Sequence, residues 1–219
     1  MVKIVSTTER DLDRLAACHN LSFPKSLASA LGKHFVKRML SWYLSSDKSF
    51  LFHIEGDSKK VIGYCGGLIS DGSLGTGSAS GMTQHSFWHA VMAFITRPWL
   101  LFHPEVLAKW PLIWKNILTK IRLRKKSHFT QEQKLQMSIE PKVGLVVIGV
   151  DPAYQGQGYG SLLLQEFESR AKDVYNIPRL QLTVHADNIA AIKAYKKNGW
   201  ERGVQMGTSL EMKKNLSLY

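Results

Sequence analysis

The sequence predicts a mixed α/β fold, and three patterns lead to this class. A continuous apolar run from Gly144 to Val150 is typical of a buried strand. A glycine-rich turn follows it and leads into residues 161–172, whose apolar side chains recur at helical spacing. Residues 179–184 then alternate as a strand does. Strands and helices therefore follow one another along the chain, as expected of a sheet covered by helices.

The chain begins with a predicted strand over residues 3–6. Thr8 is followed three residues later by Asp11, a pattern that predicts a helix start. The helix after it would bury one apolar side, made of Leu12, Leu15 and Ala16. Pro24 is expected to end this region.

Ser26 is expected to cap a second helix that runs to Tyr43 as one piece. Its apolar side chains recur at nearly helical spacing: Leu27, Leu31, Phe35, Met39 and Tyr43. Two strands are predicted next, over residues 49–54 and 60–69, with a hairpin turn at 55–57.

The C-terminal part predicts a short helix over residues 188–197, with Asn198 and Gly199 in the usual stop position. A final pair of strands is predicted over residues 201–205 and 208–213.

Composition predicts one domain over residues 1–219. The chain is 44% hydrophobic, enough to bury a core without disulfides, and Cys18 and Cys65 are expected to be small buried residues. The net charge of +12 favours anionic partners as a class. No nucleic-acid recognition motif is present, so nucleic acid is not an expected partner. The N-terminus has no signal-type region, which indicates a cytoplasmic protein.

The most informative segment is the turn after the buried strand, where three glycines stand between Gln155 and Ser161. Glycines allow a sharp turn and leave N–H groups uncovered, and a helix start with free N–H groups binds anions. The Walker pattern is excluded because no lysine follows, and the dinucleotide pattern fails at Ser161. An ordinary strand–turn–helix, with glycines needed only for packing, remains the alternative.

Two blocks resemble the GNAT superfamily of N-acetyltransferases. Gln155-x-x-Gly158-x-Gly160 is similar to that family's acetyl-CoA signature. The second block is the strand at 182–184 followed by Asn188, Ala191, Tyr195, Gly199 and Trp200. The resemblance covers residues 143–200 and implies a mixed, mostly antiparallel central sheet flanked by helices. The N-terminal part agrees only in the order of its elements.

The resemblance also implies a set of site residues. Ile148, Gly149 and Val150 would hydrogen-bond the pantetheine arm of acetyl-CoA, which is a co-substrate, and no metal is expected. The pyrophosphate would be wrapped by main-chain N–H groups of Gln155, Gly156, Gln157, Gly158, Tyr159, Gly160 and Ser161.

Two further side chains have implied roles. Asn188 would contact the cofactor or fix the loop after its strand; its alternative role is a helix N-cap. Tyr195 would protonate the departing thiolate as a general acid, or else be a core aromatic residue.

The general base stays open, because the central strand carries no carboxylate. The candidates are Glu140, Asp71, His85, His89 and His185.

The expected reaction is transfer of an acetyl group from acetyl-CoA to a primary amine by direct attack in a ternary complex. A small molecule such as an amino sugar is the preferred acceptor, and a longer acyl chain stays possible. The alternatives are a protein or peptide N-acetyltransferase, or a non-catalytic module that binds CoA or a membrane.

Residues 72–141 are expected to be a helical insertion that is rich in tryptophan and contains a basic cluster at 120–126, followed by a polar loop at 128–141. Residues 87–102 are apolar but too interrupted to cross a membrane, and residues 107–121 predict a helix. Two helices covering the acceptor side are the preferred interpretation. The alternatives are peripheral docking on an anionic membrane surface, a homodimer contact, and an apolar face that completes the core.

Overall fold

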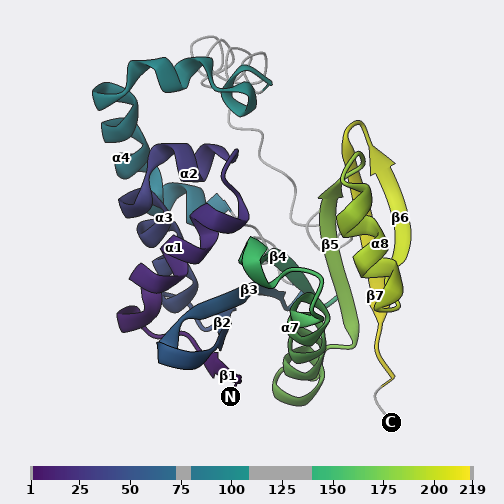
Figure 1. The fold of residues 1–219 in the computed structure, drawn as a ribbon. Helices are drawn as coiled ribbons and strands as arrows, with labels where there is room; N and C mark the ends of the chain where they lie inside the picture. The colour runs from purple at the N-terminus through teal and green to yellow at the C-terminus, as the bar shows by residue number, and fades with distance from the viewer. Residues whose placement is uncertain (1, 73–79, 109–139, 218–219) are drawn as a thin grey trace.

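The computed structural model of the chain describes residues 2–72, 80–108 and 140–217 (Figure 1). In these residues a seven-stranded sheet has the order β1-β2-β3-β4-β5-β7-β6. Every neighbouring pair is antiparallel except β4 and β5, which run parallel. The mixed, mostly antiparallel sheet predicted for this chain is therefore confirmed. The strands are β1 Lys3–Ser6, β2 Ser49–Glu55, β3 Val61–Ser70, β4 Lys142–Val150, β5 Arg179–His185, β6 Glu201–Met206 and β7 Ser209–Asn215.

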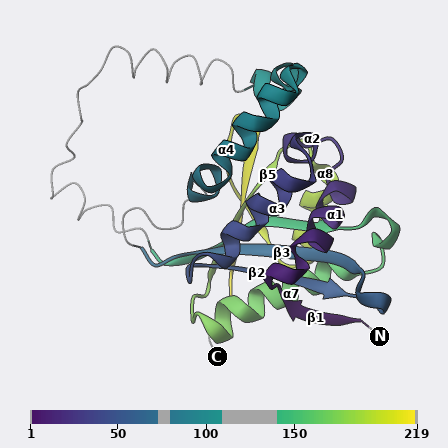
Figure 2. The same cartoon turned by 90° about the vertical axis from the view of Figure 1, so that its left-hand side faces the viewer.

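Helices cover both faces of the sheet. The α-helices are α1 Leu12–Ser22, α2 Leu27–Leu31, α3 Lys33–Ser41, α4 Ser80–Thr96, α7 Tyr159–Ser169 and α8 Ile189–Lys197. Figure 2 shows α1–α3 on one side of the sheet and α7 on the other. A 3-10 turn, Pro98–Phe102, follows α4, and a π-helical turn, Arg170–Val174, continues α7.

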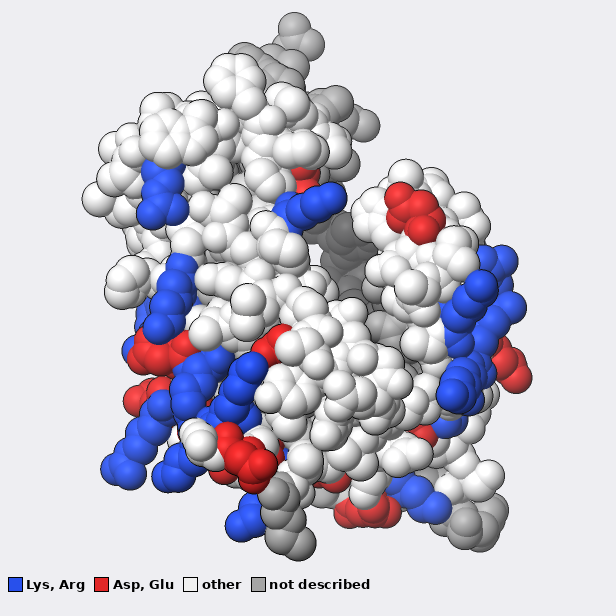
Figure 3. Space-filling view, in the orientation of Figure 1, with Lys and Arg blue, Asp and Glu red and all other residues white. Residues whose placement is uncertain are grey.

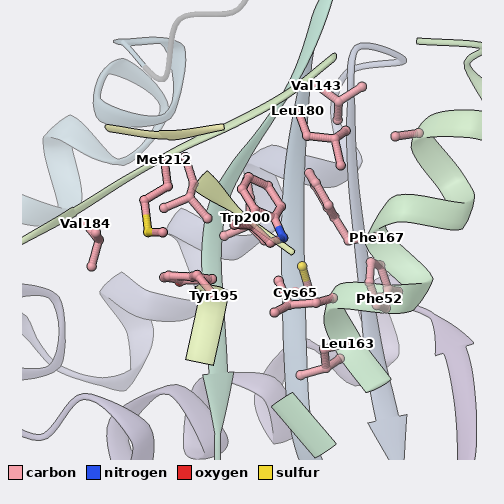
Figure 4. Close-up of a cluster of buried hydrophobic side chains, with 14 of the residues drawn as sticks. Phe52, Cys65, Val143, Leu163, Phe167, Leu180, Val184, Tyr195, Trp200 and Met212 are labelled. Atoms are coloured by element: carbon pink, nitrogen blue, oxygen red, sulfur yellow. The ribbon is translucent and has the colours of Figure 1, made fainter. Parts of the chain in front are cut away.

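The core is divided by the sheet. One cluster packs α7 and α8 against β2–β5 and β7, and Phe167, Trp200 and Cys65 lie in it (Figure 4). The other packs α1 and α3 against the opposite face of β2 and β3, around Tyr43 and Tyr64. Cys18 and Cys65 are buried free thiols, as expected. Between the two core clusters, the sheet opens where β4 and β5 separate.

The second predicted helix is wrong in one respect, because it is two helices. Gly32 has a φ of +99° and separates α2 from α3. Its N–H bonds to the carbonyl of Ser29, so the regular hydrogen-bond ladder ends there. The apolar spacing of Leu27, Leu31, Phe35 and Met39 continues through the break and therefore does not reveal it, and in α3 the fully buried residues are Val36 and Leu40. Ser26 caps α2 as predicted, accepting a hydrogen bond from Ser29 N–H.

The insertion lies between two neighbouring antiparallel strands, β3 and β4. Its described part is a long helix, α4, followed by the turn at 98–102. The helix predicted over 107–121 lies almost entirely outside the described residues, as does the basic cluster after it.

Candidate functional site

The parallel strands β4 and β5 pair over only a short length. Their register joins Val143 to Leu180 and Leu145 to Leu182, and it ends there. Beyond this point β4 continues along β3 as far as Val150, while β5 pairs with β7. Within the described residues, the β5-facing edge of β4 is therefore left without a strand partner. We call this opening the split.

An irregularity in β4 accompanies the split. The β3 residues Gly66 and Gly67 pair with Val147 and Leu145, so Val146 is an extra residue in β4. A β-bulge bends its strand and increases the local twist. The space-filling view shows a hollow between the part with α1–α4 and the part with β5–β7 and α8 (Figure 3). Unpaired backbone groups beside a hollow can bind an extended ligand by strand-like hydrogen bonds.

Gly149 allows α1 to approach the far end of β4. A Cβ atom there would lie 2.9 Å from Phe23 Cε2 and 3.1 Å from Tyr64 Cε1, which is too close. The Tyr64 hydroxyl lies 2.5 Å from His19 Nδ1, and burial lowers the pKa of His19 to about 4. The imidazole is thus neutral and supports the strand from the α1 side. Sequence reasoning missed Phe23, His19 and Tyr64, because these contacts are not local.

The turn after β4 is held by its own side chains. Asp151 is buried, and its Oδ1 accepts a hydrogen bond from Ala153 N–H at 3.0 Å. Gln155 Nε2 donates to the carbonyl oxygen of Val150 at 3.0 Å. Gln157 Nε2 donates in the same way to Ala153. These bonds order the turn, and the main-chain N–H of Gln155 is itself bonded to the carbonyl of Pro152.

The glycines of the turn serve its conformation and its openness. Gly156 and Gly158 have φ values of +79° and +89°, a region that other residues rarely adopt. A Cβ at either, or at Gly160, would meet no described atom within 4 Å. Packing therefore does not explain Gly160, whereas space for a ligand against the backbone does.

The N-terminus of α7 has the features of a candidate anion site. Leu162 N–H donates to the carbonyl of Gly158, so the N–H groups of Tyr159, Gly160 and Ser161 precede the helical ladder. They point with the positive end of the helix dipole, as in phosphate-binding loops. The turn lies directly after the C-terminal end of β4, and thus beside the split.

Asn188 and Asn198 fix the ends of α8. Asn188 Oδ1 accepts a hydrogen bond from Ala191 N–H at 3.1 Å, which confirms its N-cap role. Its contact with a cofactor stays a prediction. Asn198 Nδ2 donates to Ser161 Oγ at 3.1 Å and so ties α8 to the first turn of α7. Sequence reasoning treated Asn198 only as a helix stop.

Tyr195 lies on α8, on the sheet face that carries α7. Its ring is buried beside Trp200, with the centroids 6.1 Å apart (Figure 4). Burial raises the pKa of the hydroxyl to about 12, and the Cys65 thiol adds to the shift. Cys65 lies opposite Ile148 in the register of β3 with β4, so Tyr195 is close to the central strand. The core placement is confirmed, and the hydroxyl keeps its proton at neutral pH.

Two of the candidate bases lie far from the split. Asp71 directly follows β3, and its carboxylate lies 2.8 Å from Lys48 Nζ. Glu140 precedes β4 and forms an ion pair with Arg179. Both carboxylates flank the N-terminal end of β4, whereas the split lies toward its C-terminal end.

Two others belong to α4. His85 Nε2 lies 3.1 Å from Ser41 Oγ, and burial, with Arg38 and His89 adding to it, lowers the pKa of His85. His89 is exposed beside a groove between α3 and α4. Neither histidine lies on β4 or β5, the two strands that border the split.

His185 is the candidate that the fold brings to the split. It is the last residue of β5, and parallel strands end on the same side. Because Val184 points into the core with Tyr195, His185 points to the opposite face. Its Nδ1 lies 3.4 Å from Asp187 Oδ1.

Glu211 is a further carboxylate on the same face as His185. It lies opposite Thr183 in the register of β5 with β7, accepts a hydrogen bond from Gln181 and lies 2.9 Å from Lys213 Nζ. Sequence reasoning missed it. The signal was present, because alternation in the two predicted strands places Glu211 on their polar side.

Comparisons with known proteins agree with this geometry. Residues 121–200 match the model of the acetyltransferase (GNAT) family. The PaiA N-acetyltransferase from Thermoplasma acidophilum, solved in complex with coenzyme A, superposes with a TM-score of 0.57, covering 98% of this chain and 99% of that one at 15% identity. Residues 121–200 of the chain therefore resemble a GNAT acetyltransferase domain.

The sequence matches to curated relatives are short. A mycothiol acetyltransferase from Mycolicibacterium gilvum is 42% identical over 59 residues, which are 25% of this chain and 20% of that protein. The L-amino acid N-acetyltransferase AaaT of Escherichia coli is 39% identical over 54 residues, 25% of this chain and 33% of its own length. The chain thus spans a third or less of these relatives.

Proposed function

We propose that this chain transfers an acetyl group from acetyl-CoA to the primary amine of a small molecule. The observation that carries the proposal is the split between β4 and β5, which opens directly beside a glycine turn at the N-terminus of α7. A ligand with both an amide-bearing arm and a pyrophosphate fits this pair of features, and acetyl-CoA has both.

The donor would be held mainly by main-chain groups. Residues Ile148, Gly149 and Val150 lie in the part of β4 that has no β5 partner and are proposed to hydrogen-bond the pantetheine arm. The N–H groups of the turn from Gln155 to Ser161 are proposed to bind the pyrophosphate. Asn188 is proposed to fix the loop at the open end of β5.

The chemistry needs one bond formed and one broken. The amine nitrogen attacks the thioester carbonyl, the carbon–sulfur bond breaks, the nitrogen loses a proton and the sulfur gains one. A backbone N–H near Val150 is proposed to stabilise the oxyanion. Tyr195 is proposed to donate its proton to the departing sulfur, and its raised pKa keeps that proton in place until then.

His185 is proposed to remove the proton from the amine. It lies on the sheet face opposite Tyr195, so acid and base approach the split from different sides. Asp187, beside its Nδ1, would orient the ring. The acceptor would therefore enter on the α1–α4 side of the sheet.

A small acceptor is favoured by the names of the sequence relatives, a mycothiol acetyltransferase and an L-amino acid N-acetyltransferase. The hollow on the acceptor side is open, which also suits a peptide amine as a second candidate. The described strands form a single sheet, which supports one domain over 1–219 with 72–141 as an insertion. A cytoplasmic location is part of the same proposal.

Release of free thiol from acetyl-CoA, followed with a thiol reagent, tests the function. The purified chain is assayed against amino acids, amino sugars, polyamines and short peptides. We expect amine-dependent thiol release with at least one small amine, and mass spectrometry should show an acetylated product. Acetyl-CoA binding without thiol release from any amine would favour the non-catalytic alternative.

A further inference from the structure

Helix α4 exposes one apolar side. Trp88, Met92 and Ile95 recur at positions i, i+4 and i+7, and therefore share a face. Trp88 is 72% exposed and Ile95 is 67% exposed. Trp99 and Phe102, in the turn that follows, extend this surface, and Phe102 is 75% exposed. We call these residues the α4 face; contiguous apolar surface of this kind commonly marks an interaction site.

The α4 face belongs to a helix that is firmly anchored on its other side. Ser86 is buried, and its hydroxyl donates to the carbonyl of Met82 at 2.6 Å. Met82 packs against the cluster formed by α1 and α3, and Leu100 is buried in the turn after α4. The exposed aromatic residues are thus held outward by a packed element.

The charge around the α4 face is positive. The sequence from Ser80 to Pro104 has no acidic residue, and the next acid, Glu105, accepts a hydrogen bond from Leu27 N–H at the start of α2. Arg97 stands at the end of α4, where its guanidinium reaches the carbonyl of Ala30. In Figure 3 the upper part of the molecule is largely white, with blue at its margins and some red beside the blue at the edge of the hollow.

Two depressions join this apolar surface to basic side chains. A groove of about 300 Å³ between α2–α3 and α4 is lined by Trp88, Met92 and Arg97. A neighbouring hollow of about 420 Å³ is lined by Lys37 and Arg38, with Glu9 as its acid, and Lys37 forms an ion pair with Asp13 at 2.5 Å, so Arg38 is the main cationic group of this hollow. His34 and His89 line both depressions. Apolar and cationic groups therefore lie side by side. In a phospholipid, the acyl chains and the phosphate group are adjacent in the same way.

We propose that the α4 face docks on the surface of an anionic phospholipid bilayer. The aromatic side chains would enter the interface, where Trp is favoured, and Arg38 and Arg97 would lie at the level of the phosphates. In the described part of the chain, no helix has the length and apolar character to span a membrane. A second copy fits less well, because a two-fold contact would bring these like charges together.

Sedimentation of the full chain with vesicles tests this proposal. Vesicles of phosphatidylcholine with phosphatidylglycerol should pull the chain down, vesicles of phosphatidylcholine alone should do so weakly, and added salt should lower the bound fraction. Absence of binding to the anionic vesicles at low salt would overturn the proposal.

A matched pair of variants locates the surface. Ile95→Glu and Val174→Glu each place a charge at an apolar residue that is 67% exposed, but Val174 lies at the end of α7. We expect Ile95→Glu to lower the vesicle partition at least tenfold and Val174→Glu to leave it unchanged. Equal effects of the two would contradict the proposal, as would a dimer in analytical ultracentrifugation that only Ile95→Glu dissociates. Acetyl-CoA binding should be the same in both variants, which separates this test from that of the donor site.

Discussion

The turn after β4 and the α4 face present opposite kinds of surface. The turn offers main-chain N–H groups and has glycines where side chains would stand, so under the proposed function it would recognise a ligand by backbone shape. The α4 face offers large apolar side chains on an ordinary helix, so it would recognise a partner by area and charge. The difference implies different sensitivities: the turn should respond to an added Cβ, and the α4 face to a change of polarity.

The largest effect is expected when Tyr195 is replaced, because this residue belongs, with the turn, to the proposed acetyl-CoA site. Tyr195→Phe keeps the ring in the core and removes the proton donor, so kcat should fall about 100-fold, within the usual range for a general acid. The affinity for acetyl-CoA should change little. Steady-state kinetics and calorimetry measure the two separately, and an unchanged kcat would remove the proposed role.

The raised pKa of Tyr195 also predicts a pH profile. The hydroxyl is protonated below a pKa of about 12, so kcat should rise as the amine loses its proton and should not fall again up to pH ~10. A descending limb near pH 8 that is present in the wild type and absent in Tyr195→Phe would contradict this.

The next largest effect is expected at Gly158. Gly158→Val and Gly207→Val both replace a glycine of positive φ that has open space around it, and Gly207 lies in the distant β6–β7 turn. Each should lose on the order of 1–3 kcal/mol of stability from backbone strain. Only Gly158→Val should weaken acetyl-CoA binding, by tenfold or more, in calorimetric titration. Equal affinities in the two variants would show that the turn does not bind the donor.

A smaller effect is expected at Asn198. Asn198→Ala removes the hydrogen bond to Ser161 Oγ but no proposed ligand contact. The affinity for acetyl-CoA should fall about threefold, in line with the ~0.5–1.5 kcal/mol of an ordinary hydrogen bond. Lys193→Ala, at an exposed position on the same helix, is the control and should leave the affinity unchanged.

The smallest effect is expected on the free energy of unfolding when a residue of the α4 face is replaced. Ile95→Ser should change the free energy of unfolding by less than ~0.5 kcal/mol, because the side chain is exposed. Leu163→Ala, in the core beside β3, should cost about 2–5 kcal/mol. Denaturant unfolding compares the two, and a large loss for Ile95→Ser would mean that the α4 face is part of the folded core.

The elements with local signals could be predicted from the sequence. The glycines at 156 and 158 need positive φ, Asn188 caps α8, and Gly199 ends it, each for a reason within a few residues. The break at Gly32 was missed because the apolar spacing continues across it. The bulge at Val146 and the short pairing of β4 with β5 depend on neighbouring strands, which no local pattern encodes.

The candidate site was predictable to the same extent. The turn residues and Tyr195 were predicted from their motif positions, and their roles stay predictions, whereas Glu211 and His19 are placed only by cross-strand or helix–sheet contacts. His185 could be separated from the other candidate bases only once the direction of β5 relative to β4 was known. The sequence of α4 shows no clear helical periodicity, because apolar residues occur on its exposed side as well as its packed side.

The central claim is that the split and the turn bind acetyl-CoA, and the shift in Tm on adding it tests this most directly. At a hundredfold excess over Kd, the ligand adds roughly 2.7 kcal/mol of stability. For a chain of this size, that corresponds to a rise of about 5–10 °C. We predict this rise with acetyl-CoA and not with ATP or NAD. No rise at millimolar acetyl-CoA, or an equal rise with all three ligands, would contradict the account.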